Sequence, residues 1–123
     1  MQVYKAPLND YAFLIKDFLT LSSADLILKN SDLNIEDLEM ILEEAAKLCE
    51  NTLLPLNQSG DEEGCVLKDG KVVTPKGFKE AYKSFVENGW QGITVNKKYG
   101  GQALPYFINV FLDEMISSSN MSF

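Results

Sequence analysis

Tyr99-Gly100-Gly101-Gln102-Ala103-Leu104-Pro105, with the segment 106–116 (YFINVFLDEMI) after it, is the stretch that decides how this chain is interpreted. Paired glycines permit turns that residues with side chains resist, so residues 96–105 predict a loop that ends where Leu104-Pro105 opens a helix. That helix is apolar almost all the way round, and its narrow polar stripe holds only Tyr106, Asn109, Asp113 and Glu114. Such a helix normally lies inside a larger body. Because few residues follow it, we expect the chain to be a piece of something bigger.

The segment before Asn34 predicts an extended arm and a first helix. Pro7 keeps residues 1–8 out of a helix interior. Asn9 or Asp10 can then cap a helix. Its apolar face is expected at Phe13, Leu14, Phe18 and Leu21, followed by a short turn from Ser22-Ser23 to Leu28 and a loop over 29–34.

The strongest helical pattern runs from Ile35 to about Leu53, with Asn34 as its cap. Glu36, Asp37 and Glu39 lie near its positive end. Pro55 and the cluster 57–60 are expected to end it, before an acidic loop at 61–64. Its core face comprises Leu38, Ile41, Leu42, Ala45, Leu48 and Cys49.

A small hairpin and a third helix are predicted next. Asp69-Gly70 suits a tight hairpin turn between residues 65–67 and 71–73. Thr74-Pro75 is typical of a helix start, and Gly89 of a helix end. We expect this helix to run to about Asn88 and Trp90 to fold back, buried, against its face of Phe78, Ala81, Tyr82, Phe85 and Val86. The predicted fold is all-α, with about four main helices and a small hairpin.

Composition excludes several classes of function. A net charge of -7, from 18 acidic against 11 basic residues, disfavours nucleic acid or an anionic membrane as partner. The chain has neither histidine nor arginine, which excludes hydrolase triads, imidazole metal sites and bidentate phosphate forks. Cys49 and Cys65 are expected to be reduced thiols, Cys49 as a core residue. No apolar run is long enough to span a bilayer, so a cytoplasmic location follows by default.

Three features could carry chemistry, and each has a simpler structural interpretation. Gly100-Gly101 could cradle a phosphate, but a structural turn is favoured because no nucleotide-binding motif is present. Asp61-Glu62-Glu63 could hold a metal, but a solvated loop is favoured because consecutive residues rarely converge on one ion. Glu114 could act as a base if burial raised its pKa, although a surface carboxylate is the simpler interpretation.

Several strings in this sequence resemble a known family. The strings 89–93 (GWQGI), 99–105 (YGGQALP) and 113–116 (DEMI) are similar to the N-terminal helical domain of the acyl-CoA dehydrogenases. The segments 4–10, 57–65 and 74–82 resemble the branch of that family that includes the 3-methylmercaptopropionyl-CoA dehydrogenases. The resemblance covers essentially the whole chain. It divides the chain into an N-terminal extension with the first helix (1–34) and the helical domain itself (35–123).

The resemblance implies a parent flavoprotein of fatty acid metabolism that holds FAD and removes hydrogens from the α and β carbons of an acyl-CoA. Its glutamate base and most flavin contacts would belong to a middle β-domain and a C-terminal helical domain absent here. We therefore expect no catalytic, cofactor-binding or metal-binding residue in this chain. Only Met121 and Phe123 are expected near the acyl pocket. Ala103 departs from the family, which often has glycine there, and would be strained at a positive backbone angle.

The expected partners are the remaining domains of the parent enzyme and its acyl-CoA substrate. The alternative is a free-standing helical module that binds a protein through the 104–116 helix. For the isolated chain, Phe107, Phe111, Leu112 or Met115 are expected to form an exposed patch that drives self-association through that helix.

Overall fold

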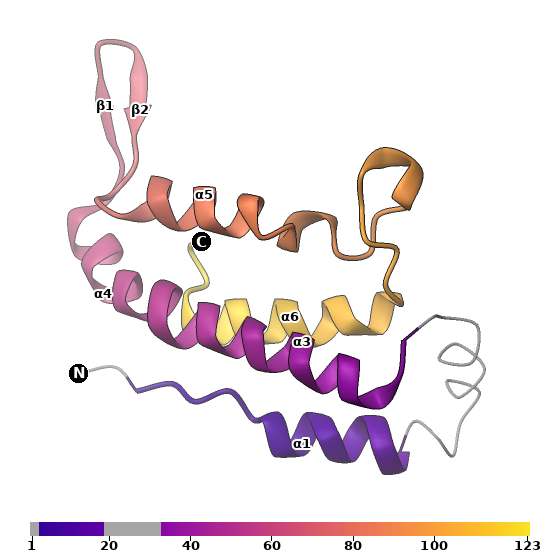
Figure 1. Cartoon of the computed structure of the whole chain (residues 1–123). Coiled ribbons are helices and arrows are strands. Elements are labelled where there is room, and N and C mark those ends of the chain that lie inside the picture. The colour runs from indigo at the N-terminus through magenta and orange to yellow at the C-terminus, as the bar shows by residue number, and fades with distance from the viewer. Residues whose placement is uncertain (1–2, 19–32) are drawn as a thin grey trace.

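The computed structural model describes residues 3–18 and 33–123, and it confirms a mainly helical fold with one small hairpin (Figure 1). The helices are α1 (Leu8–Phe13), α3 (Ile35–Leu48), α4 (Leu54–Glu63), α5 (Phe78–Glu87) and α6 (Tyr106–Ser119). The strands are β1 (Val66–Lys68) and β2 (Lys71–Val73). Wider π-helical turns follow α1 and α3, at Leu14–Phe18 and Cys49–Leu53, and 3-10 turns lie at Trp90–Gly92 and Lys97–Tyr99.

The start of α3 confirms the predicted cap. The Asn34 side chain accepts from the Asp37 amide at 2.8 Å, and the Asp37 carboxylate accepts from the Asn34 amide at 3.2 Å. This reciprocal pair satisfies two of the amides that a helix start leaves free. The predicted core face is buried except for Ile41, which is half-buried.

The expected end of α3 at Pro55 and 57–60 was wrong. The π-helical turn Cys49–Leu53 leads straight into α4, so Pro55 lies in the first turn of a new helix, where its missing amide costs nothing. Residues 61–63 form the last turn of α4, and the expected acidic loop is reduced to Gly64. Gly60 lies inside α4. A Cβ there would be 2.4 Å from the Phe78 ring, so glycine at this position allows that ring to pack on the helix.

The first helix begins earlier than expected, which changes its buried face. Pro7 precedes α1, so Asn9 and Asp10 lie within the helix and do not cap it. Tyr11 and Ile15 are buried, whereas Phe13 and Phe18 are more than half exposed. The expected turn after Ser22-Ser23 lies outside the described residues.

The helix α6 is buried more completely than the sequence predicted. Phe111, Leu112 and Met115 are 7%, 2% and 0% exposed, so the expected patch was wrong. The Tyr11 ring of α1 lies 4.7 Å from the Phe111 ring, and α3 contacts α6 along the core. The N-terminal extension thus covers a side of α6 that we expected to be bare. The expected apolar patch on α6 is therefore not available to drive self-association.

The hairpin is confirmed in position and turn. Val66 pairs with Val73, Leu67 with Val72 and Lys68 with Lys71, and both Asp69 and Gly70 have positive φ. The start of α5 at Thr74-Pro75 was wrong, because α5 begins only at Phe78, after Gly77 at φ 89. The Lys76 amide donates to the Glu63 carboxylate at 3.0 Å, which ties this segment to α4 and delays the helix. The predicted stop at Gly89 is confirmed by its φ of 76.

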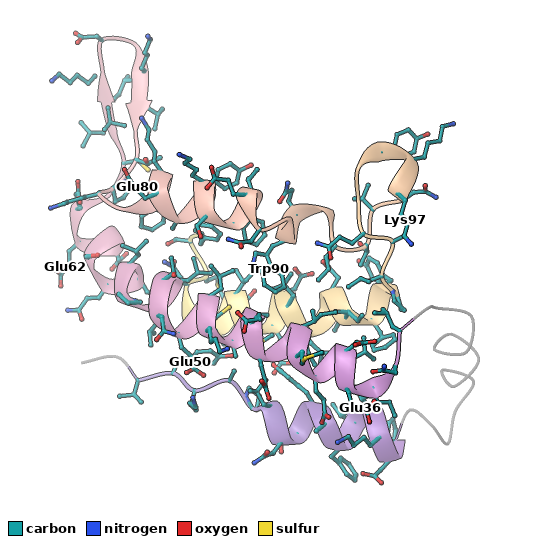
Figure 2. The ribbon with its side chains drawn as sticks, in the orientation of Figure 1. Glu36, Glu50, Glu62, Glu80, Trp90 and Lys97 are labelled. Carbon is teal, nitrogen blue, oxygen red and sulfur yellow. The ribbon has the colours of Figure 1, made fainter. Side chains whose placement is uncertain are left out.

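The N-terminal arm is fastened to the turn after α3 by a single carboxylate, that of Glu50 (Figure 2). Glu50 accepts from the Ala6 amide at 3.0 Å and pairs with the Lys5 ammonium at 2.8 Å. Ala6 is buried. The Lys5 partner and the Ala6 amide hold the pKa of Glu50 below its ordinary range, despite some opposing desolvation. The carboxylate therefore supports folding mainly as the anion.

Replacing Glu50 tests this fastening. Glu50→Ala leaves the Ala6 amide without its partner, which costs about 1–3 kcal/mol for a buried donor. Glu50→Gln keeps an acceptor and loses only an ion pair whose Lys5 side chain is 79% exposed, so its cost should stay below about 1 kcal/mol. Chemical denaturation of both variants measures the difference. Equal costs would contradict the role of the Ala6 bond.

The lowered pKa of Glu50 also gives the fastening a pH dependence. A carboxyl with a depressed pKa in the folded state stabilises fully above its unfolded pKa, and the contribution is lost as the pH falls through the folded pKa. Part of the stability of the native chain should therefore disappear on acidification, and that part should be missing from Glu50→Gln. Parallel pH profiles of the two proteins would contradict this.

Ala103 adopts the strained conformation that its sequence context predicted, with φ 56. Residues with a side chain pay roughly 1–2 kcal/mol in this region. After the greater chain freedom of glycine is subtracted, Ala103→Gly should stabilise the chain by about 1 kcal/mol. Ala12→Gly within α1 is the matched control and should destabilise by about 1 kcal/mol. Thermal unfolding compares them, and a destabilised Ala103→Gly would refute the strain.

Candidate functional site

The last residues of the chain close one side of an apolar depression of about 540 Å³, which we call the C-terminal hollow. The end of α4, the base of the hairpin and the start of α5 form its other walls. Its lining residues are Gly60, Asp61, Gly64, Cys65, Thr74, Pro75, Phe78, Lys79, Tyr82, Ser122 and Phe123. Apolar cavities with a few polar groups at the edge are typical small-molecule sites.

Asn120 fixes the turn that brings the chain end to this hollow. It is 1% exposed, and its side-chain amide donates to the Leu53 carbonyl at 3.1 Å. Its side-chain oxygen accepts from the Ser122 amide at 3.2 Å and the Ser122 hydroxyl at 2.7 Å. The sequence analysis missed this role, although a polar residue directly after an apolar helix was a usable signal for a cap.

Phe123 packs against α5 at the edge of the hollow. Its ring lies 5.6 Å from Phe85, edge-on, and 6.4 Å from Tyr82. Met121 is 83% exposed and lies on a separate shallow depression with Asn57, Gln58, Asp61 and Ser122. The two residues expected near an acyl pocket therefore lie on adjoining hollows that share Asp61 and Ser122. The sequence named neither Phe78 nor Tyr82 for this site.

The hollow can hold an apolar group, and its polar edge comprises Asp61, Thr74, Lys79 and Ser122. Cys65 is an exposed free thiol at the rim. Across residues 3–18 and 33–123, no three side chains of the His, Cys, Asp and Glu types gather as a metal site. The three carboxylates at 61–63 are exposed on the last turn of α4, and Glu62 and Glu63 accept hydrogen bonds from Gln58 and Lys76. The arrangement suits binding of an apolar ligand.

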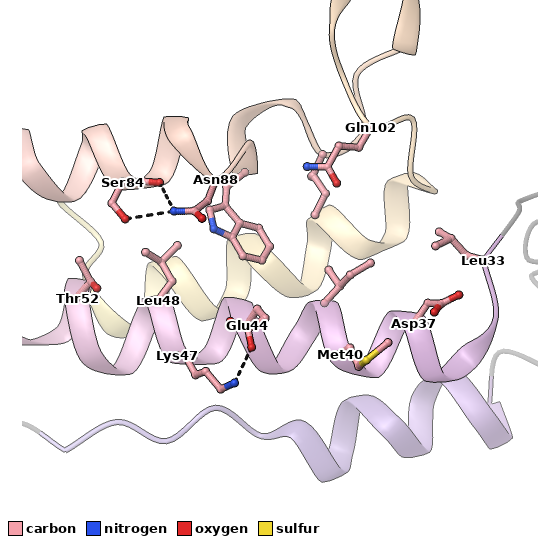
Figure 3. A pocket seen from close by; sticks show the side chains of 13 residues that line it. Leu33, Asp37, Met40, Glu44, Lys47, Leu48, Thr52, Ser84, Asn88 and Gln102 are labelled. Atoms are coloured by element: carbon pink, nitrogen blue, oxygen red, sulfur yellow. Dashed lines mark hydrogen bonds and ion pairs between the residues drawn. The ribbon is translucent and has the colours of Figure 1, made fainter.

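A second depression of about 680 Å³ lies between α3 on one side and the end of α5 with the loop after it on the other (Figure 3). We call it the α3–α5 groove; it is lined by Leu33, Asp37, Met40, Ile41, Glu44, Lys47, Leu48, Thr52, Ser84, Asn88, Trp90, Ile93 and Gln102. Trp90 lies between α5 and α3 and is half-buried (Figure 2), where the sequence predicted substantial burial. The rings of Tyr82 and Phe85, expected beside Trp90, pack on Phe123.

The paired glycines form a structural turn. The amides of Gly100 and Gly101 donate to the carbonyls of Lys97 and Asn96, so neither is free to hold a phosphate. A Cβ on Gly101 would lie 2.0 Å from the Val95 carbonyl oxygen, which explains why glycine is needed there. The phosphate-cradle alternative is therefore not supported.

Burial is the main cause of the raised pKa values of Cys49 and Tyr11. Burial raises the pKa of Cys49 to about 11 against the opposing hydrogen bond of Ser119, so this thiol stays protonated in the core. Burial is also the largest cause that raises the pKa of Tyr11, with the nearby Glu114 charge adding to it. Glu114 itself is exposed on α6. That exposure favours the surface interpretation of Glu114 over a buried base.

Within the described part of the chain, no helix combines the length and apolar character needed to cross a membrane.

Comparison with known proteins identifies relatives of this chain. The sequence profile of the family described as "Acyl-CoA dehydrogenase, N-terminal domain" matches residues 35–123. A curated relative, 3-methylmercaptopropionyl-CoA dehydrogenase of Ruegeria pomeroyi (strain ATCC 700808 / DSM 15171 / DSS-3), is 34% identical over 120 residues. That alignment covers 98% of this chain and 20% of the relative, so the chain spans about a fifth of the relative's length.

Proposed function

This chain belongs to the family of acyl-CoA dehydrogenase N-terminal domains, and we propose that it is the helical N-terminal domain of an FAD-dependent acyl-CoA dehydrogenase. The observation that carries the proposal is the family match over residues 35–123. The relative named 3-methylmercaptopropionyl-CoA dehydrogenase, of which this chain spans about a fifth, supports it. The remaining domains of the parent enzyme are then the natural partners of this chain.

The chemistry proposed for the parent is α,β-dehydrogenation of an acyl-CoA thioester. When bound, the flavin supplies a hydride acceptor, and a glutamate supplies the base for the α proton. The paired-glycine turn offers no free amide to a cofactor phosphate, because Gly100 and Gly101 already donate to Lys97 and Asn96. We propose that the catalytic steps belong to residues of the other domains of the parent.

This chain's own contribution is proposed to be a wall of the acyl pocket. Met121 and Phe123 lie on adjoining hollows, and the larger one is lined by the rings of Phe78, Tyr82 and Phe123. We propose that this C-terminal hollow contacts the acyl group, or the segment of the parent enzyme that holds the acyl group. We further propose that the chain divides into an extension (1–34) and a domain (35–123), a division that the family match over residues 35–123 supports. We also propose a cytoplasmic location.

The alternative, a free-standing module that binds through the 104–116 helix, has weak support. Ile108, Phe111, Leu112 and Met115 are all buried within the chain itself, so little of that helix remains to meet a partner.

The isolated chain should neither bind FAD nor oxidise an acyl-CoA, because the base and most flavin contacts would lie in other domains. Calorimetric titration of FAD, together with dye reduction assays over several acyl-CoA chain lengths, measures both properties. Circular dichroism of the same sample provides the control that the chain is folded. Saturable flavin binding or turnover would show that the active site has been assigned to the wrong domains.

A further inference from the structure

The hairpin and its turn, residues 66–73, form a projection that we call the finger. All six strand residues are exposed, and four of them are apolar: Val66 56%, Leu67 73%, Val72 67% and Val73 46%. Figure 1 shows that the finger extends away from the helical body, on the side opposite α3. A lone two-stranded hairpin is only marginally stable in water. Exposed apolar surface of this kind commonly marks an interaction site.

The tip of the finger holds two lysines, Lys68 and Lys71, and one carboxylate, Asp69, so it has a net positive charge in an acidic chain. Lys68 and Lys71 lie directly opposite each other in the register, an arrangement that destabilises a strand pair through like-charge repulsion. Neither forms an ion pair with another residue in the described part of the chain. Residues 65–99 hold seven lysines and three carboxylates, although the whole chain has a net charge of -7. A negatively charged partner surface would relieve the repulsion at the tip.

The α3–α5 groove has the complementary character. Its apolar lining includes Trp90, Leu48 and Met40, the last of which is 57% exposed. Asp37 and Glu44 contribute carboxylates to it (Figure 3). Glu44 pairs with Lys47, which also lines the groove, so the lining itself holds two carboxylates and one ammonium group. The surrounding segment 33–64 is strongly acidic, with nine carboxylates and one lysine. An apolar finger with a cationic tip therefore matches this groove in both apolar surface and charge.

We propose that the finger of one copy of this chain docks into the α3–α5 groove of a second copy. The two surfaces are different parts of one chain, so each contact leaves a finger and a groove free, and the association grows or closes into a ring. A finger of two short strands cannot bury the roughly 1,200 Å² of a stable interface, so the contact is weak. Because exposed charges contribute to it, salt weakens it further.

Sedimentation velocity across concentration, at low and at high salt, tests the proposal. A reducing agent is required because the exposed Cys65 thiol could form a disulfide between copies. We expect the mean mass to rise with concentration at low salt. Lys68→Glu/Lys71→Glu should weaken association at least tenfold. The matched control Lys97→Glu/Lys98→Glu makes the same charge change on another exposed loop and should weaken it much less.

A mixing experiment identifies the two surfaces. Glu44→Lys places positive charge in the groove and should reduce self-association, while a mixture of Glu44→Lys with Lys68→Glu/Lys71→Glu should associate more strongly than either variant alone. Circular dichroism verifies that each variant is folded. A chain that is monomeric under all conditions, equal effects of the two lysine pairs, or a mixture no stronger than its components would each overturn the proposal.

Discussion

Replacing Gly101 with alanine should destabilise this chain by about 3 kcal/mol, at the upper end of the usual cost of overpacking. The added Cβ would lie 2.0 Å from the Val95 carbonyl oxygen and 2.4 Å from its carbon. These are backbone atoms that cannot rotate away. The same carbonyl accepts from the Ala103 amide at 2.8 Å, so any movement of Val95 also weakens that hydrogen bond. Chemical denaturation gives the free energy of unfolding.

Gly92→Ala is the matched control in the same region. The nearest atom to its added Cβ would be 3.6 Å away, which is ordinary contact, and its φ is not positive. This variant should be neutral or stabilised by about 0.4–1 kcal/mol, because alanine lowers the entropy of the unfolded chain. If both glycines tolerate alanine equally, the close approach at Gly101 is not a real constraint.

Phe111→Ala should cost about 3–5 kcal/mol, the usual range for removing a buried aromatic side chain. Phe111 is 7% exposed and lies between Tyr11 of α1 and Phe107 of its own helix, with ring centroids 4.7 Å and 6.2 Å away. Its removal leaves a cavity where α1 packs on α6. Thermal or chemical unfolding of the variant measures the loss.

Val110→Ala, one residue earlier, is the control for this prediction. Val110 is 53% exposed, so its truncation should change stability by less than about 0.5 kcal/mol. The pair also separates the observed packing of α6 from the exposed patch that its sequence predicted. A small effect of Phe111→Ala on stability would instead support the exposed patch that the sequence predicted.

Local signals in the sequence predicted those elements that are stabilised by residues close to one another in the sequence. Asn34 and Asp37 cap α3 within four residues, and Asp69-Gly70 sets the hairpin turn through its own backbone preference. Gly89 likewise ends α5 by its positive φ. In each case the energy comes from neighbours in the chain, so no knowledge of the tertiary fold was needed.

The errors have both local and distant causes. Pro55 usually signals a helix end, but the π-helical turn directly before it leads straight into α4, which is a local effect. Thr74-Pro75 lost its capping role because Lys76 bonds to Glu63 on α4. The burial of α6 depends on Tyr11, which belongs to a segment treated as a mere extension.

The candidate site shows the same division. Met121 and Phe123 came from the family resemblance, which gives positions but no geometry. The contacts of Asn120 with Leu53, and of Phe123 with Phe85, join residues that lie far apart in the sequence. No local pattern predicts such pairs. The walls of the C-terminal hollow could therefore be identified only from the structure.

If this chain is one domain of a flavoenzyme, the full-length product of its gene will contain a bound flavin and a catalytic base. The decisive measurement is the visible absorption spectrum of that purified product, before and after addition of an acyl-CoA under anaerobic conditions. We predict a flavin spectrum that bleaches when a suitable acyl-CoA is added. A gene product without bound flavin, or a reading frame that stops at Phe123, would contradict the assignment.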